Sequence, residues 1–267
     1  MGGIDELKQR HRVLWGMGDY PRIAEVFREE AVATVEAAGI AQGDEVLDVA
    51  AGNGNIAIEA ARRGARVVAT DLSPRMVELG RERTAAEGLQ IDWGEADVEE
   101  LPFEDDRFDI VTTSFGAMFA PRPQRAAAEM FRVVKPGGRV VMTNWVPEGP
   151  MDLISNLMGK YLPGGPEGLP DPSEWGERET AGKRFAPHAE AVSFVTGAVR
   201  WDFDDSKQQM SFLTQSAPPL AAAKAVLPPE RFEELLSELE DGYKEMSIDP
   251  DRVVYDADYL IVIGTKS

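Results

Sequence analysis

The sequence predicts an α/β fold with a mostly parallel sheet that helices cover on both faces. Three observations support this prediction. From residue 45 onward, short apolar runs bounded by turn residues alternate with segments of helical periodicity. The spacing of these runs is typical of right-handed crossover helices, which join parallel strands. Finally, 43% of the 267 residues are hydrophobic, which is enough for a sizeable core.

Two helices are expected before the first strand. Apolar residues recur at three- and four-residue spacing over residues 4–14, which predicts an amphipathic helix. The segment WGMGDYP, with two glycines and a proline, then breaks this pattern. A second helix is expected over residues 21–38, with Gly39 as its stop. We expect this N-terminal region to form a helical lid.

Strands and helices then alternate along the chain. The predicted strands are residues 45–50, 66–71, 90–96, 108–115, 138–145, 191–203 and 256–266. The helices predicted between the first five strands are residues 54–63, 74–88 and 123–134. Ser73 is expected to cap the second of these helices, with Pro74 at its first position. Residues 206–247 are also expected to be helical, because apolar residues form an amphipathic stripe there.

Residues 146–190 differ from the rest of the chain in composition. Proline and glycine are dense, and no long periodic element stands out. Because large apolar side chains such as Leu153 and Trp175 are still present, we expect an insertion over the ligand face rather than a flexible linker. The predicted organisation is a lid at 1–43, a core at 44–145, the insertion at 146–190, and C-terminal strands at 191–267 with a helical insertion at about 206–247.

Composition excludes several classes of function. The chain has 28 basic and 47 acidic residues, a formal net charge of −19, which repels nucleic acids and anionic membranes. It has no cysteine, which excludes disulfides, thiolate zinc sites and a cysteine nucleophile, and no metal site is expected. No apolar segment has the length of a signal peptide or a membrane span, so a cytoplasmic protein without a membrane anchor is expected. The oligomeric state stays open.

The segment LDVAAGNGN, which begins at Leu47, carries the strongest chemical signal. Gly52, Gly54 and Ala57 satisfy the dinucleotide pattern G-x-G-x-x-G/A, and Asp71 lies at the distance expected for a ribose-binding acid. An NAD(P)-dependent oxidoreductase is therefore one interpretation. However, Asp48 lies at the end of the strand, four residues before the first glycine. A carboxylate there repels a pyrophosphate but suits a cation such as an ammonium group.

With its surroundings, this segment resembles the first motif of class I S-adenosylmethionine-dependent methyltransferases, acid-x-G-x-G-x-G. It departs from that motif at Ala50 and Asn55, which replace the first and third glycines. The segments VVATDLSPRM, EADVEELPFEDDRFDIVTTSF and RVVKPGGRVVMTNW then resemble further motifs in the same order, up to residue 145. Among these enzymes the chain is most similar to the ubiquinone/menaquinone-biosynthesis type. The resemblance implies a Rossmann-like, doubly wound sheet of seven strands with an antiparallel last strand.

The resemblance also implies S-adenosylmethionine as cofactor and S-adenosylhomocysteine as product. The residues it assigns to the cofactor are Asp48, Ala50, Gly52, Gly54, Asp71, Leu72, Met76, Asp97, Val98, Ser114 and Phe115. The methionine moiety is expected near Asp48 and Ser114. The two oxygens of Asp71 can accept hydrogen bonds from both ribose hydroxyls. Asp97 is expected to accept a hydrogen bond from the adenine amino group.

The expected reaction is an in-line displacement, in which a small organic acceptor attacks the sulfonium methyl group. Positioning and desolvation suffice for this reaction unless the acceptor must lose a proton. Neither His11 nor His188 is assigned as a base, and no catalytic residue is assigned. Aromatic residues near the strand ends and the glycine break are candidates for the acceptor pocket, namely Trp15, Tyr20, Phe119 and Trp145. A protein that binds the cofactor for regulation or for non-methylating chemistry is the other alternative.

Overall fold

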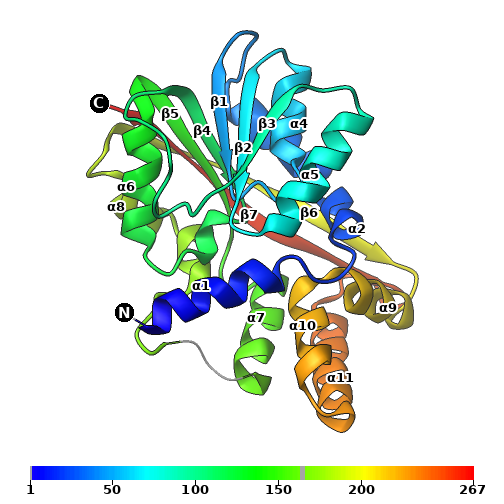
Figure 1. Ribbon diagram of the computed structural model, residues 1–267. Coiled ribbons are helices and arrows are strands. Elements are labelled where there is room, and N and C mark those ends of the chain that lie inside the picture. Colours follow the sequence, from blue (N-terminus) through cyan, green and yellow to red (C-terminus); the bar gives the residue numbers. More distant parts are fainter. Residues whose placement is uncertain (1, 163–165) are drawn as a thin grey trace.

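A computed structural model describes residues 2–162 and 166–267 (Figure 1). One sheet of seven strands has the order β3-β2-β1-β4-β5-β7-β6. The strands are β1 (Glu45–Val49), β2 (Arg66–Asp71), β3 (Ile91–Glu95), β4 (Phe108–Ser114), β5 (Val134–Trp145), β6 (Ala189–Phe203) and β7 (Val253–Lys266). The first five strands are parallel, and β7 runs antiparallel to both β5 and β6. The predicted fold, with an antiparallel last strand, is confirmed.

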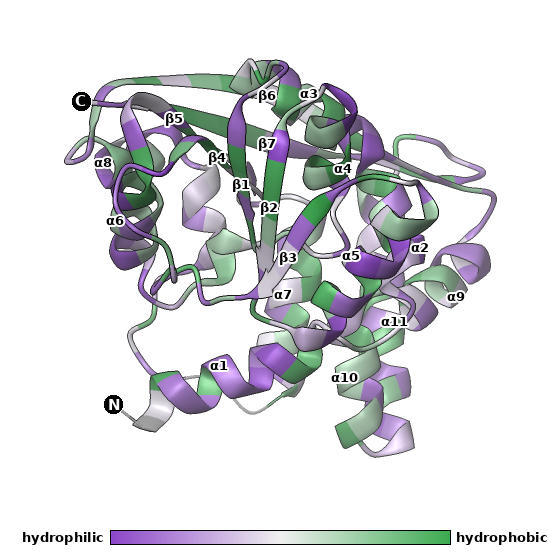
Figure 2. Ribbon diagram, turned by 45° about the horizontal axis from the view of Figure 1, so that its top comes forward, coloured by the Kyte–Doolittle hydropathy of each residue, from purple (hydrophilic) through white to green (hydrophobic). Residues whose placement is uncertain are grey.

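Helices cover both faces of the sheet because its central strands are apolar on both sides (Figure 2). Figure 1 shows α6 and α8 on one side and α4 and α5 on the other. These helices are α4 (Asn55–Arg62), α5 (Pro74–Ala86), α6 (Pro123–Val133) and α8 (Arg178–Phe185). Helix α3 (Arg28–Ala38) packs against α4 and the strands β4 and β5. The core lies between these layers, around side chains such as Leu47 and Val141.

A third group of helices lies beyond the carboxyl ends of the parallel strands (lower part of Figure 1). Its members are α1 (Gly2–Leu14), α7 (Pro150–Tyr161), α9 (Ser206–Ser216), α10 (Pro218–Val226) and α11 (Pro229–Met246). Helix α7 packs against α11, and α1 contacts α10. Segments far apart in the sequence therefore form one cover over the edge of the sheet where ligands bind in open α/β folds.

Several predicted boundaries need correction. The single helix expected over residues 21–38 is three segments, α2 (Tyr20–Ala24), the 3₁₀ turn η1 (Glu25–Phe27) and α3. The tighter turn accompanies contacts of the Phe27 ring with three other aromatic rings. Residues 206–247 form three helices rather than one continuous element, because prolines begin two of them. The strand expected from residue 138 already begins at Val134, which pairs with Phe108.

The segment 146–190 is more regular than its composition suggested. It holds α7, a 3₁₀ turn η3 (Pro172–Gly176) and α8. Helix α7 was not predicted because its segment is rich in proline. Pro150 nevertheless fits the first turn, where the backbone N–H of a helix has no intrahelical partner. Helix α8 covers β6 and β7 and is therefore part of the sheet's own layers. Residues 163–165 of this segment, and Met1 of the expected lid, lie outside the described residues.

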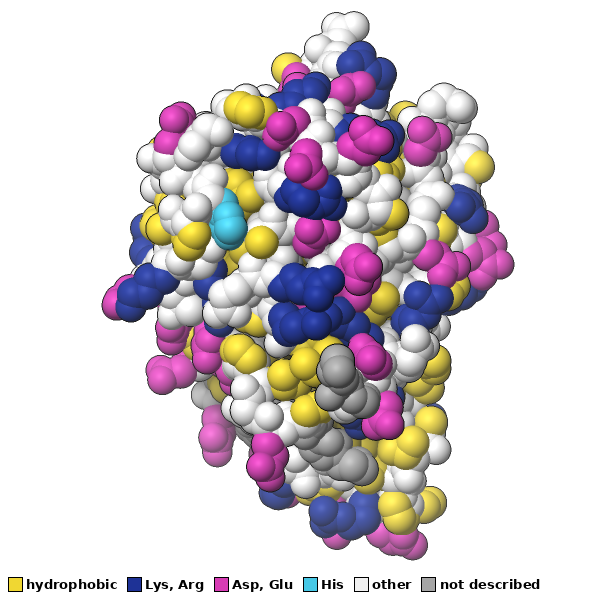
Figure 3. Space-filling model, turned by 60° about the vertical axis from the view of Figure 1, so that its left-hand side comes forward, with side chains coloured by type: hydrophobic (Ala, Val, Ile, Leu, Met, Phe, Trp, Pro, Cys, Tyr) yellow, Lys and Arg dark blue, Asp and Glu magenta, His cyan; other side chains and the backbone are white. Residues whose placement is uncertain are grey.

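Charged side chains of both signs lie on one face of the molecule. Figure 3 shows them interleaved on the face turned toward α6 and α8. Many form ion pairs, such as Arg132 with Asp105 at 2.8 Å and Lys135 with Asp109 at 2.9 Å. On this face, the negative net charge is therefore not gathered into one patch. Within the described ranges, no helix combines the length and apolar character needed to cross a membrane.

Candidate active site

A cavity of about 590 Å³ lies at the carboxyl ends of the parallel strands. Residues from α1, α2, α7, α9 and α10 close it from outside the sheet. The expected site residues that line it are Trp15, Tyr20, Asp48, Ala50, Gly52, Asp71, Leu72, Met76, Asp97, Val98, Ser114, Phe115, Phe119 and Trp145. Of the expected site residues, Gly54 is the one that does not line this cavity. The fold therefore gathers residues from five strand ends and from the N-terminal helices.

The turn between β1 and α4 explains the small residues of LDVAAGNGN. Ala50, Gly52 and Gly54 all have positive φ, at 51°, 56° and 93°. Another loop approaches closely, since a Cβ on Gly116 would lie 2.6 Å from the Cβ of Ala50. A Cβ on Gly54 would lie 2.9 Å from the ring of Trp93. Gly54 is thus required for the turn and for packing under the loop.

Asp48 is buried, and both of its carboxylate oxygens accept hydrogen bonds. The Ala57 backbone N–H donates to Oδ2 at 3.1 Å, and the Thr112 hydroxyl donates to Oδ1 at 3.2 Å. Asp48 therefore ties the start of α4 and strand β4 to the end of β1. Burial raises its pKa to about 8, and the nearby carboxylates of Asp71 and Glu30 add to this shift. A cation in the cavity would stabilise its charged form.

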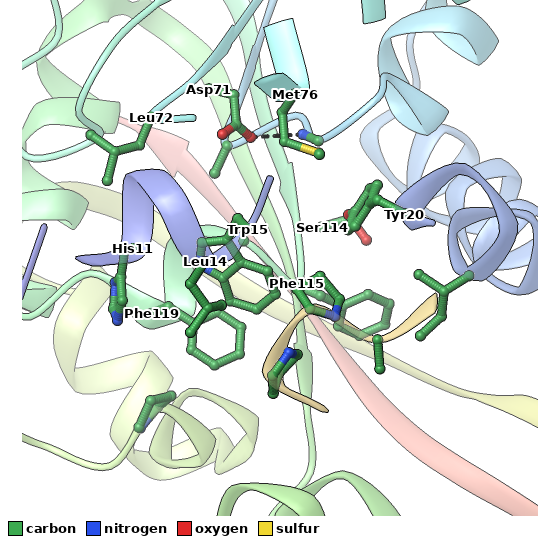
Figure 4. A pocket seen from close by; sticks show the side chains of 18 of the residues that line it. His11, Leu14, Trp15, Tyr20, Asp71, Leu72, Met76, Ser114, Phe115 and Phe119 are labelled. Atoms are coloured by element: carbon green, nitrogen blue, oxygen red, sulfur yellow. Dashed lines mark hydrogen bonds between the residues drawn. The ribbon is translucent and has the colours of Figure 1, made fainter. Parts of the chain in front are cut away.

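Asp71 ends β2 and orders two turns. Its Oδ2 accepts from the Gly52 backbone N–H at 2.9 Å, and its Oδ1 accepts from the Ser73 backbone N–H at 2.8 Å. Figure 4 shows this carboxylate near Leu72 and Met76. Burial raises the pKa of Asp71 to about 6, although the backbone donors oppose the shift. Each oxygen keeps a second lone pair, so the carboxylate can still accept hydrogen bonds from a ligand.

Asn55, where the motif has its third glycine, connects three parts of the chain. Its side-chain amide donates to the Ala24 carbonyl of α2 at 2.7 Å. Its side-chain oxygen accepts from Arg83 of α5 at 2.6 Å. Glycine could make neither bond. The departure from the motif at this position therefore holds the N-terminal helices against the core.

Asp97 lies where the loop after β3 meets the lid helix α1. Lys8 of α1 donates to Asp97 Oδ2 at 2.5 Å and also to the buried carboxylate of Glu99. The other oxygen, Oδ1, accepts from the Glu99 backbone N–H at 2.9 Å. Both Lys8 and Asp97 line the cavity. In this structure, the carboxylate expected to meet adenine is thus paired with Lys8 of α1.

Comparisons with known proteins identify the family of this chain. Residues 46–138 match the family described as methyltransferase domain. An uncharacterized protein from Mycobacterium bovis is 40% identical over 193 residues, which are 72% of this chain and 70% of the relative. The demethylmenaquinone methyltransferase of Clavibacter sepedonicus is 44% identical over 111 residues, which are 42% of this chain and 45% of that enzyme.

The chain belongs to the class I S-adenosylmethionine-dependent methyltransferases. It is an enzyme of that class, with S-adenosylmethionine as its cofactor. The YcgJ protein of Bacillus subtilis superposes with a TM-score of 0.62 at 18% identity, over 89% of this chain and 98% of that one. At that identity the likeness supports the fold alone.

At the end of β4, this methyltransferase places Ser114 and Phe115 against the N-terminal helices. The Ser114 hydroxyl donates to Glu30 of α3 at 2.7 Å. Phe115 has a φ of 52°, and its backbone N–H donates to the Thr143 carbonyl at 2.9 Å. Its ring stacks on Trp145 with a centroid distance of 3.6 Å and an interplanar angle of 4°. Backbone and ring contacts both fix this segment.

Aromatic and aliphatic side chains line the part of the methyltransferase cavity that lies away from Asp71 (Figure 4). Trp15 and Phe119 lie side by side in Figure 4, with ring centroids 4.9 Å apart. Further apolar residues that line the cavity are Phe27, Met151, Ile154, Met158, Leu162, Trp201, Leu213 and Tyr243. Tyr20 lies elsewhere, since a Cβ on Gly52 would be 2.7 Å from its hydroxyl. Burial, then the charges of Asp71 and Asp48, raise the pKa of Tyr20.

Sequence reasoning missed several residues of the methyltransferase cavity. Lys8 and His11 follow one face of α1 at three-residue spacing, and that periodicity was the available signal. Burial and then Arg10 lower the pKa of His11. The apolar residues of α7 also carried a signal, because Met151, Ile154 and Met158 recur at helical spacing. No sequence pattern marked Glu30 as a site residue, because it is one of 47 acidic residues in the chain.

Proposed function

We propose that this enzyme transfers a methyl group from S-adenosylmethionine to a small, uncharged and largely apolar organic acceptor. One observation carries the proposal: a single cavity has an acidic end and an apolar end. Asp48 and Asp71 belong to the first, and the Trp15–Phe119 pair belongs to the second. Methyl transfer needs both partners in one enclosed space, with the reacting atoms in line.

We assign the acidic end to the cofactor. The free lone pairs of Asp71 suit the two ribose hydroxyls, and Leu72 and Met76 flank the position of adenine. Asp48 suits the ammonium group of the methionine moiety, directly or through water. Asp97 can accept a hydrogen bond from the adenine amino group if that group and Lys8 share its carboxylate. The positive-φ turn at Gly52 allows close approach of the backbone.

We assign the apolar end to the acceptor. Burying a charged acceptor among Trp15, Ile154 and Met158 would cost desolvation energy, because these side chains are apolar. Trp201 adds one polar feature. It is buried, it lines the cavity, and its Nε1–H has no partner among the described residues. Because this N–H is itself buried, it does not open onto the cavity, and the apolar end keeps its apolar character.

Catalysis in this proposal rests on positioning and desolvation. The acceptor attacks the sulfonium methyl group in line, the carbon–sulfur bond breaks, and the sulfur keeps the electron pair. The chain contributes an enclosed site that excludes water and holds the two reactants at one distance. No catalytic residue is assigned: His11 lines the cavity from α1, and the nature of the acceptor atom decides whether a base is needed.

The test is a transfer assay with methyl-labelled S-adenosylmethionine. Its acceptor panel pairs uncharged aromatic hydroxyl compounds with carboxylated or quaternary-ammonium analogues of the same size. We expect label in the uncharged members. Label in the charged members alone would contradict the acceptor assignment. Stabilisation by S-adenosylhomocysteine with no transfer to any member would favour a cofactor-binding role without methylation.

A further inference from the structure

Glu30 is a buried carboxylate that the expected site did not include. It lies in the first turn of α3 and is 3% exposed. Its Oε1 accepts from the Thr34 hydroxyl at 2.6 Å, and its Oε2 accepts from the Ser114 hydroxyl at 2.7 Å. Among the ion pairs of the described residues, none includes Glu30. A buried carboxylate without a cation is costly, so a cationic ligand would account for its place.

Ser114 links Glu30 to the cavity. A serine hydroxyl has one proton, and Ser114 donates it to Glu30. The oxygen lone pairs of Ser114 are therefore left for a donor in the cavity that it lines. Thr34 and Thr143 stand behind Glu30, with their hydroxyl oxygens 2.6 Å apart. This chain of hydroxyl groups fixes the direction of the carboxylate.

The other titratable groups around Glu30 are mostly acidic or neutral. The charge of Glu30 raises the pKa of Asp48 on β1, of Tyr20 on α2 and of Tyr259 on β7. Asp71 also raises the pKa of Tyr20, whereas the positive charge of Arg83 lowers it. The Arg83 guanidinium is itself paired with the Asn55 side chain, Glu25 and Glu87. Burial raises the pKa of Glu30, which is the response expected of an acid that lacks a cation.

We propose that Glu30 is a specificity residue that favours the charged methyl donor over the uncharged-sulfur product. S-adenosylmethionine has a sulfonium charge, which S-adenosylhomocysteine lacks. The inference rests on the proposed function and on the expectation from sequence that the methionine end of the cofactor lies near Asp48 and Ser114. In a buried site a charge acts beyond hydrogen-bond distance, so Glu30 need not touch the sulfur. When the methyl group leaves, the attraction is lost, and the product exchanges more readily for fresh cofactor.

The first test compares the affinities of two ligands by calorimetry. Glu30→Gln should weaken S-adenosylmethionine binding about ten-fold and S-adenosylhomocysteine binding by at most about two-fold. Glu29→Gln, an exposed neighbour in the same turn, should change neither. Ser114→Ala should weaken both ligands by a similar factor. Equal weakening of both ligands by Glu30→Gln, or none, contradicts the proposal.

The second test uses the unmodified enzyme, so it does not depend on a variant that folds. Each ligand is titrated near neutral pH in two buffers of different ionisation enthalpy, which gives the number of protons released. The donor should release more protons than the product, because its extra charge favours the ionised carboxylate. Equal release contradicts the role of Glu30. Absence of binding by either ligand contradicts the proposed function instead.

Discussion

Lys8 of the N-terminal helix pairs with Asp97 at 2.5 Å, although 89 positions separate them in the sequence. The Lys8 side chain is 12% exposed, and its second partner, Glu99, is fully buried. Helix α1 is thus fastened to the loop after β3 at the mouth of the cavity, and Arg12 adds a pair with Glu95 at 2.6 Å. Charged side chains of α1 therefore hold this helix against the end of β3 and the loop that follows it.

The ion pair of Lys8 predicts the rate of ligand exchange. Lys8→Met should increase the dissociation rate of S-adenosylhomocysteine about ten-fold, because a partly buried charge pair no longer holds the lid. Stopped-flow displacement measures this rate. Arg10→Met, an exposed position on the same helix, is the matched control and should leave the rate unchanged. A rate in Lys8→Met equal to that of the control would show that α1 does not limit exchange.

Asp71 should dominate the affinity for the cofactor. Asp71→Asn removes the charge and places an amide donor where two backbone N–H groups and the ribose hydroxyls donate. Charge-assisted hydrogen bonds contribute about 1.5–3 kcal/mol each, so S-adenosylhomocysteine binding should weaken at least ten-fold. Calorimetry measures the change. Asp92→Asn, exposed on the neighbouring strand β3, should bind normally, and unchanged affinity in Asp71→Asn would refute the ribose assignment.

Stability should fall as pH rises in the absence of ligand. Folding raises the pKa of Asp48 from 3.8 to about 8 and that of Asp71 from 3.8 to about 6. The folded state therefore binds more protons than the unfolded state between these values. Its free energy of unfolding decreases by up to about 1.4 kcal/mol per pH unit for each such proton. The decrease begins near the pKa that each aspartate has in the unfolded state and ends above the pKa that it has in the folded state.

Urea denaturation from pH 5 to pH 9 measures this dependence. The large negative net charge also destabilises the protein at high pH, so the comparison is with Asp48→Asn, which keeps all surface charges. The variant should show a flatter profile than the unmodified enzyme. Parallel profiles would mean that Asp48 is ionised throughout this range in the folded state.

The fold was largely accessible from the sequence, because periodicity and turn residues report local structure directly. Strand β2 was predicted to the residue, and the sheet with its antiparallel last strand was confirmed. The break at Phe27 was not predictable, since it depends on contacts with distant aromatic rings, whereas the prolines at 218 and 219 are a local signal for the second break. Helix α7 was missed because proline and glycine surround it.

The site was predictable only where a motif marks it. Asp48, Asp71 and Ser114 stand at strand ends within motifs, and all three line the cavity. Lys8 and Glu30 lie in the N-terminal helices, outside every motif, and their partners are more than 80 residues away. No local pattern encodes such pairs. The same limit explains why Asn55 looked like a lost glycine until its partners were known.

Asn55 provides a test of that explanation. Asn55→Ala removes the bonds to the Ala24 carbonyl and to Arg83 and should lower the free energy of unfolding by about 1–3 kcal/mol. Asn55→Gly, which restores the motif, should lower it further, because glycine also weakens the start of α4. Chemical denaturation measures both. A variant with the motif glycine that is as stable as the unmodified enzyme would contradict the bridging role.

In the proposed function, one cavity holds the cofactor at its acidic end and the acceptor at its apolar end. Ile154→Trp tests it most directly, since Ile154 lines the apolar end from α7. The measurement pairs calorimetric binding of S-adenosylhomocysteine with transfer of labelled methyl to an acceptor of the unmodified enzyme. The account predicts unchanged product binding and transfer reduced at least about 100-fold, since small misplacements of reactants cost this much. Weakened binding of S-adenosylhomocysteine with normal transfer would contradict it.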